Sequence, residues 1–224
     1  QVVVERMLAK EGLNRHDLGR EQFVERVWKW VDQYGNRIYE QLKRLGASCD
    51  WSRKSFTLDH GPSKAVRATF VNLYNKGLIY RGERMTNWCP RCRTALSDLE
   101  VKYREENAAF YHIRYLLEGS KQGVTIATTR PETLLGDTAV AVNPNDKRYS
   151  DLAGGKVTVP VVSRVVPLIV DDAVDPEVGT GALKITPGHD PTDFEIGRRH
   201  NLPTLSIMDS EGKLNENAGP FQGQ

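Results

Sequence analysis

The sequence predicts an α+β fold in which a helical N-terminal part is followed by a compact, β-barrel-like domain. In residues 23–45, apolar side chains recur at steps of three and four, which is the period of an amphipathic helix. From Phe110 onward the apolar runs are short, rich in β-branched residues, and separated by Gly, Pro, Asn and Asp. Such runs are typical of strands. We therefore expect helices over 1–85, a connector over 86–108 and the β-rich domain over 109–224.

Two helices are expected in the N-terminal part. The first is expected to continue through Gly35, although glycine weakens a helix, and to stop at Gly46. The second is expected to begin with Ser63 as its N-cap and to end near Gly77. Its apolar face is formed by Val66, Phe70 and Leu73.

The β-rich domain is expected to contain several short strands and one helix. The predicted strand segments are 110–117, 124–128, 138–142, 156–170 and 182–186. The helix follows the last of them, with Asp190 at the N-cap, Pro191 at the first helical position and Asp193 in the first turn.

Composition and charge restrict the class of protein. Hydrophobic residues make up 39% of the chain and charged residues 27%, and we find no signal peptide and no apolar run long enough to span a membrane. Three cysteines do not make a disulfide framework, so we expect a cytoplasmic protein. Residues 61–104 hold nine Lys and Arg against three Asp and Glu. This excess predicts phosphate contacts, although simple solvation of a helix face is the alternative for each cation.

The first candidate site is Cys89-Pro90-Arg91-Cys92, which has the spacing of half a zinc ribbon. Tetrahedral zinc needs four ligands, and the only other cysteine is Cys49. We therefore expect an incomplete metal half-site of Cys89 and Cys92, with a reduced thiol pair as the alternative.

The second candidate site is the run from Thr128 to Thr133, followed by Asp137. Pro131 suits a first helical position, so Thr129 and Arg130 are expected at a strand-to-helix junction with outward-pointing backbone N–H groups. Such a junction can bind a phosphate or the oxygen of a tetrahedral intermediate. The structural alternative is a threonine cap beside a surface arginine.

The third candidate site combines Lys184, Thr186, His189, Asp190 and Asp193. Lys184 and Thr186 alternate on one face of a strand, while the two aspartates open the next helix, so they can meet at one cleft. The alternatives are an N-cap for Asp190, a first-turn acid for Asp193 and a solvated strand residue for Lys184.

Two stretches of the chain closely resemble the signature segments of an editing domain. They are ATTRPETLLGDTAVAVNP at 127–144 and GTGALKITPGHDPTDFEIGRRHNLP at 179–203. Both are similar to the editing domain of the valyl-tRNA synthetase family. Segments such as FTLD and NKGLIYRGERMTNWCP, before residue 91, resemble the part of that family's class I catalytic Rossmann domain between its HIGH motif and its editing insert. The resemblance implies a helical remnant of that domain followed by the editing barrel.

The resemblance also implies roles for individual residues. Asp193, Lys184 and Asp190 correspond to positions implicated in hydrolysis, and Asp193 is expected to pair with the substrate α-ammonium. The expected substrate-binding positions are Thr128, Thr129, Arg130, Asp137, Val178, Thr186 and His189. The chain departs from the family at Val178, where an aromatic residue is usual, and at Gly188, where alanine is usual.

The function implied by the resemblance is post-transfer proofreading. Threonine would be hydrolysed from the 3′ end of mischarged tRNA(Val) by a positioned water, within an enzyme that attaches valine to tRNA(Val) using ATP. Isoleucyl- and leucyl-tRNA synthetases share the Thr-Arg-Pro-Glu-Thr and Gly-Thr-Gly runs and remain alternatives, as does a non-catalytic tRNA-binding role. A free-standing editing protein is disfavoured because it has no use for residues 1–85.

Editing is expected to require no cofactor. ATP and Mg²⁺ would serve only the parent enzyme, and a zinc site in this family takes its other ligands from beyond the editing insert. The chain begins at Gln1 without Met and ends at Gln224, so we expect a piece of a longer synthetase. It has no segment like HIGH or KMSKS, and we expect no aminoacylation by these residues alone.

Overall fold

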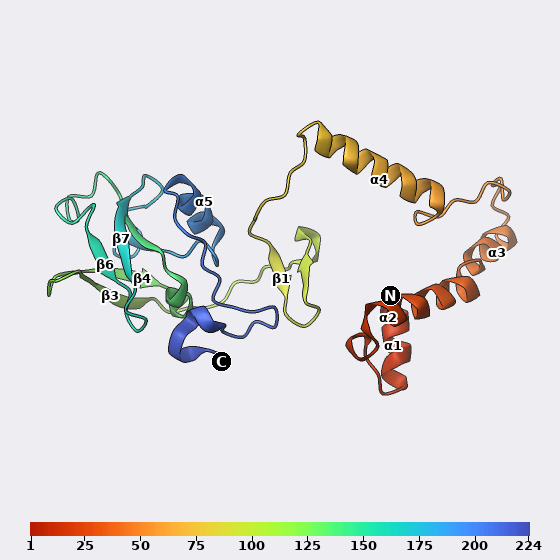
Figure 1. The fold of residues 1–224 in the computed structure, drawn as a ribbon, viewed down its shortest axis with the longest axis horizontal. Coiled ribbons are helices and arrows are strands. Elements are labelled where there is room, and N and C mark those ends of the chain that lie inside the picture. The colour runs from red at the N-terminus through yellow and green to blue at the C-terminus, as the bar shows by residue number, and fades with distance from the viewer. The chain divides into compact units, whose positions relative to one another are not determined.

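The computed structural model describes residues 1–224, which divide into two compact units, Gln1–Arg81 and Gly82–Gln224. The first unit contains only helices, and all the strands belong to the second (Figure 1). The predicted α+β class, with helices first and strands after them, is confirmed. No helix combines the length and the apolar character that a membrane span requires.

The helical unit holds four helices, α1 (Val2–Lys10), α2 (Arg15–Tyr34), α3 (Arg37–Arg44) and α4 (His60–Asn75). A capping box begins α2: the Asn14 side chain accepts hydrogen bonds from backbone N–H groups of the first turn, and Asp17 accepts one from the backbone of Asn14. Val4 and Leu8 of α1 are buried.

The prediction of one continuous helix over 23–45 is wrong, because the chain breaks between α2 and α3. Gly35 and Asn36 are poor helix formers, and the N–H of Gly35 donates to the carbonyl of Val31 at 2.7 Å. A Cβ on Gly35 would lie 2.6 Å from that oxygen, so this close turn requires glycine. The predicted stop at Gly46 is confirmed, and its φ is +77°.

Helix α4 begins earlier than predicted. Asp59 is its N-cap residue, with extended backbone angles, and Ser63 lies in the first turn. Pro62 is accommodated because the first turn of a helix needs no intrahelical N–H donors. Ser63 Oγ instead donates to the carbonyl of Leu58 at 3.2 Å. Within its unit, the predicted apolar face of α4 is exposed at Val66 and Phe70.

The second unit begins with a small hairpin of β1 (Asn87–Cys89) and β2 (Thr94–Leu96), followed by a six-stranded sheet. Each predicted strand segment contains a strand, and 156–170 contains two, joined by a turn in which Val161 and Ser163 have positive φ. The sheet strands are β3 (Tyr111–Leu117), β4 (Gly123–Thr128), β5 (Ala139–Val142), β6 (Lys156–Thr158), β7 (Val165–Val170) and β8 (Ala182–Ile185).

The sheet has the strand order β4-β3-β6-β7-β5-β8. All neighbouring strands are antiparallel except the parallel pair β5–β7. The two edge strands, β4 and β8, approach each other closely enough to line one cavity, so the sheet is nearly closed and barrel-like.

The core of this unit lies on both sides of β5, whose residues are all buried. Val140 and Val142 pack into the barrel interior with residues of β3, β4 and β7. Ala139 and Ala141 face the opposite way and pack against Ile196 of α5 (Pro191–Arg199). This alternation follows from the two-residue period of a strand, and it fixes α5 beside the end of β8.

Candidate functional site

Two junctions between a strand and a helix meet at one cavity. The first leads from β4 to a short 3-10 helix, η2 (Pro131–Gly136), and the second leads from β8 to α5. The cavity has a volume of about 290 Å³, at the small end of the range for ligand pockets. It is lined by Ala127, Thr128, Thr129, Arg130, Thr133, Leu183, Lys184, His189, Asp190, Thr192 and Asp193.

Lys184 is buried at the base of this cavity, with 7% of its surface exposed. Its Nζ donates to Thr186 Oγ1 at 2.6 Å and lies 3.6 Å from Asp137 Oδ1. The alternative of a solvated strand residue is therefore wrong for Lys184. A buried ammonium is costly unless it is paired, and Asp137 supplies the pairing charge.

Asp137 is fully buried beneath Lys184 and accepts two hydroxyl hydrogen bonds. Thr186 Oγ1 donates to its Oδ1 at 2.6 Å, and Tyr115 OH donates to its Oδ2 at 2.5 Å. Burial raises the pKa of Asp137, while Lys184 and the two hydroxyl donors oppose that rise. Burial and the carboxyl group of Asp137 also raise the pKa of Tyr115, so its phenol remains a hydrogen-bond donor.

Asp190 is the N-cap residue of α5 and Asp193 lies in its first turn, as predicted, but they differ in environment. Asp190 Oδ1 caps the helix by accepting from the backbone N–H groups of Thr192 and Asp193 at 2.8 and 3.1 Å. Asp193 is buried, and its Oδ2 accepts from the backbone N–H of Thr186 at 2.9 Å. Burial raises the pKa of Asp193 to about 6, and the nearby Asp190 adds to the rise.

This raised pKa predicts a pH dependence of stability. Asp193 binds its proton more tightly in the folded chain than in the unfolded chain, so its contribution to the free energy of unfolding decreases as pH rises from about 4 to about 6. Asp193→Asn should remove that slope while keeping a side-chain acceptor for the Thr186 N–H. Urea unfolding of both proteins between pH 4 and 7 measures the difference, and parallel pH profiles would contradict the prediction.

Arg130 and His189 come from different junctions and contact each other at the cavity. Arg130 Nη1 donates to the carbonyl of His189 at 3.0 Å. The backbone N–H of Ile207 donates to His189 Nε2 at 3.0 Å. Because a backbone N–H can only donate, the imidazole proton is on Nδ1. Burial lowers the pKa of His189, and the charges of Arg130 and Lys184 contribute, so His189 is a neutral residue of the cavity.

The sequence predicted that the backbone N–H of Arg130 points outward and is free to bind a ligand. This prediction is wrong, because that N–H has a partner within the turn. It donates to Thr128 Oγ1 at 3.1 Å, because a threonine side chain readily closes a turn with the N–H two residues on. The positive charge that this junction offers to a ligand therefore comes from the guanidinium of Arg130, whose side chain is 51% exposed.

The structure brings most of the predicted site residues together. Seven of them line the cavity, Asp137 and Thr186 lie buried beneath it, and Val178 is outside the lining and 61% exposed. Thr133, the last residue of the second candidate run, also lines the cavity, whereas sequence reasoning missed Tyr115 and the lining residues Ala127, Leu183 and Thr192. Strand alternation was an available signal for Tyr115, since Ile113 and Leu117 share its inward face.

Gly188, where alanine is usual in the resembling family, lies against the chain at Leu205. A Cβ at Gly188 would be 2.5 Å from the carbonyl oxygen of Leu205. This backbone therefore requires glycine, and an alanine would demand a shift of the segment that ends at Ile207, the residue that holds His189.

Cys89 and Cys92 lie together at the tip of the β1–β2 hairpin. The backbone N–H of Cys92 donates to Cys89 Sγ at 3.4 Å, which lowers the pKa of the Cys89 thiol. Trp88 Nε1 donates to the carbonyl of Ser210, and Arg93 pairs with Glu211, so the hairpin is fastened to the turn at 209–213. No group of three or more potential metal ligands gathers here or elsewhere in the structure. Two thiols are half of the four ligands that a tetrahedral zinc ion needs.

We expect a polypeptide of these 224 residues to retain well under one zinc ion per molecule. Two thiolates leave half of the tetrahedral coordination to water, so the ion should dissociate during dialysis. Metal analysis of the dialysed protein, with Cys89→Ser/Cys92→Ser as the control, provides the measurement. One tightly held zinc per monomer would show that further ligands come from elsewhere, such as a second copy.

Comparison with known proteins places the chain in a family. The family model described as tRNA synthetases class I (I, L, M and V) matches residues 1–205. The chain belongs to the class I tRNA synthetases. Valine–tRNA ligases of Dehalococcoides mccartyi and Carboxydothermus hydrogenoformans are 59% and 57% identical to it, each over 100% of this chain and 25% of the relative. This synthetase chain therefore spans about a quarter of the length of these relatives.

Solved structures similar to the chain include two leucyl enzymes. A ternary complex of Agrobacterium radiobacter K84 LeuRS with tRNA and LeuAMS has 20% identity and a TM-score of 0.40, over 91% of this chain and 34% of that one. The structure titled GlLeuRS-CP1 has 19% identity and a TM-score of 0.30, over 34% of this chain and 43% of that one.

Proposed function

We propose that the Gly82–Gln224 unit removes threonine from mischarged tRNA(Val), within an enzyme that attaches valine to tRNA(Val) using ATP. The observation that supports this most is the buried Lys184–Thr186–Asp137 network at the base of a small polar cavity, with Asp193 beside it. The identity of 59% to a valine–tRNA ligase supports the valine enzyme over its isoleucine and leucine relatives.

The polar lining suits threonine better than valine. A synthetic site shaped for valine discriminates poorly against a near-isostere that only adds a hydroxyl. The proposed cavity instead prefers threonine over valine, because the threonine hydroxyl can hydrogen-bond to groups such as Thr129, Lys184 and Asp190. Valine offers no hydroxyl, so its binding would displace water from these polar groups without replacing the hydrogen bonds that the water made.

The proposed mechanism uses a positioned water. Asp193, ionised above pH about 6, pairs with the α-ammonium of the threonyl ester. The Arg130 guanidinium and the Lys184 ammonium are the available positive groups for the oxyanion of the tetrahedral intermediate. The ester is already reactive, so orientation of the water and charge stabilisation are sufficient without a covalent acyl-enzyme.

Hydrolysis of threonyl-tRNA(Val) is the direct test. The full-length protein should release threonine much faster than the uncatalysed ester hydrolyses, and it should leave valyl-tRNA(Val) largely intact. Equal rates for both esters would contradict the proposed selectivity. Binding of tRNA without any deacylation would leave a binding role, to which the basic segment 61–104 would contribute.

A further inference from the structure

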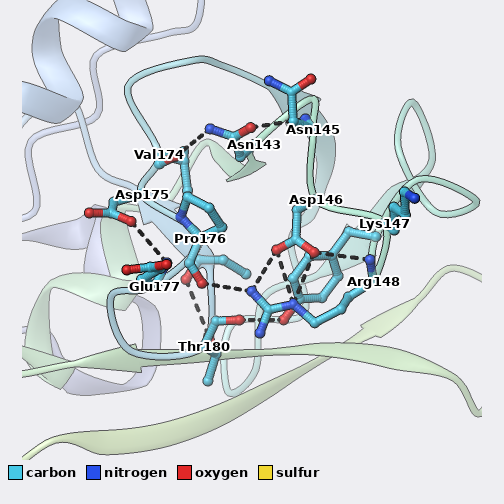
Figure 2. A network of polar contacts seen from close by, with 12 residues as sticks. Asn143, Asn145, Asp146, Lys147, Arg148, Val174, Asp175, Pro176, Glu177 and Thr180 are labelled. Carbon is cyan, nitrogen blue, oxygen red and sulfur yellow. Dashed lines mark hydrogen bonds and ion pairs between the residues drawn. The ribbon is translucent and has the colours of Figure 1, made fainter.

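Two loops of the Gly82–Gln224 unit are joined by a set of polar contacts (Figure 2). One loop, 143–149, follows β5, and the other, 174–181, leads into β8. Three side chains of the first loop donate to main-chain carbonyls of the second. These bonds are Asn143 Nδ2 to Val174 O at 2.7 Å, Arg148 Nη2 to Pro176 O at 2.7 Å and Tyr149 OH to Thr180 O at 2.8 Å.

Asp146 holds Arg148 in the position that makes this contact. Its side chain is only 5% exposed, and it pairs with the guanidinium through two atoms, Nε at 2.9 Å and Nη2 at 2.6 Å. It also accepts from the backbone N–H of Arg148 at 2.9 Å. A bidentate pair fixes both the distance and the plane of a guanidinium, so Asp146 orients Arg148 for its hydrogen bond to Pro176 of the second loop.

The second loop touches this pair on one side and the cavity wall on the other. Gly181 has a φ of +76°, and a Cβ there would lie 2.2 Å from Arg148 Nη2 and 2.9 Å from Asp146 Oδ2. Gly179 packs on Ala127 of β4, where a Cβ would meet the alanine methyl group at 3.0 Å. Ala127 lines the cavity, so the loop lies directly behind one edge of the cavity.

We infer that Asp146 and Arg148 are positioning residues for this site, which hold the segment 178–181 against β4 behind the cavity wall at Ala127. Neither residue lines the cavity. They act through the loop that precedes β8, whose residues Leu183 and Lys184 do line it. The inference rests on the proposed editing function for its kinetic consequence, but its structural part is independent of that function.

The expected consequence is weaker substrate binding with little change in the chemical step. Lys184 is held separately by Thr186 and Asp137, so loss of the pair should displace the cavity wall at Ala127 and leave the base of the cavity in place. In the full-length protein, Arg148→Gln should raise the KM for threonyl-tRNA(Val) by about three- to ten-fold, the scale of one or two lost hydrogen bonds. The kcat should change less than about two-fold.

Two further variants separate positioning from general damage. Asp146→Asn should have the same effect as Arg148→Gln. The double variant should be no worse than either single variant, because both changes remove the same ion pair. Tyr149→Phe removes only the hydroxyl bond to Thr180 and should raise KM by about two-fold. Arg198→Gln is the matched control, since it removes an exposed arginine that pairs with Glu195 on α5, and it should change neither constant.

Amide hydrogen exchange tests the same inference without relying on hydrolysis. Amides of residues 178–183 should exchange faster in Arg148→Gln than in Arg198→Gln. Inactive wild-type protein with this faster exchange would overturn the proposed function and retain the positioning role. Active wild-type protein with unchanged KM and exchange in Arg148→Gln would overturn the inference alone. A fall in kcat at constant KM would also overturn it, since that result would place Arg148 in the reaction itself.

Discussion

Lys184→Met should lower the free energy of unfolding of the Gly82–Gln224 unit by about 3–5 kcal/mol at pH 7. Methionine fills much of the same space, so the loss comes from charge rather than from a cavity. It would leave the fully buried Asp137 with two hydroxyl donors and no cation. Because burial already raises the pKa of Asp137, protonation can relieve the unpaired charge, and the loss should shrink as pH falls.

Urea unfolding of the full-length protein, followed through signals from this unit, measures the effect. Lys184→Met/Asp137→Asn should recover at least half of the loss, since the pair is then neutral and the hydroxyls of Tyr115 and Thr186 can rotate to suit an amide. Arg198→Met provides the control, because its ion pair with Glu195 is exposed and should contribute less than about 1 kcal/mol. A loss of similar size in the control would contradict the special role of the buried pair.

Asp193→Ala should reduce kcat/KM for deacylation of threonyl-tRNA(Val) by about ten- to a hundred-fold. This corresponds to about 1.5–3 kcal/mol of transition-state stabilisation, the usual strength of a hydrogen bond to a charged group. The physical reason is the loss of the carboxylate that we expect to hold the α-ammonium of the substrate. Wild-type activity should rise with pH through about 6, where Asp193 ionises.

Asp193→Asn separates this charge from the structural hydrogen bond. Its amide oxygen can still accept from the Thr186 N–H, so the variant should fold normally and yet lose most of the activity. Glu195→Gln is the control, because Glu195 is exposed and lies two residues further along α5, and it should retain full activity. Deacylation by folded Asp193→Ala at the wild-type rate would remove Asp193 from the reaction.

Local patterns were sufficient to predict much of the fold and part of the site. The runs of β-branched residues correspond to β3–β8, and the Asp190–Pro191 pair begins α5 as expected. Such features depend on neighbours within a few residues, through strand alternation and helix capping. The same local signals were too weak to locate the break at Gly35, because a helix tolerates a single glycine. They also could not choose between Asp59 and Ser63 at the start of α4, because both residue types are good N-caps.

By itself, the sequence determined the α+β class, the two strand-to-helix junctions and the candidate residues that they carry, because these follow from backbone preferences and side-chain period. Only the tertiary structure decided which of those residues share an environment. Asp137 and Thr186 are 49 positions apart and bond at 2.6 Å, and Tyr115 reaches Asp137 from another strand. Strand order and barrel closure bring these groups together and exclude water from them. The resulting burial determines that Lys184 is paired rather than solvated and that Asp193 titrates near pH 6.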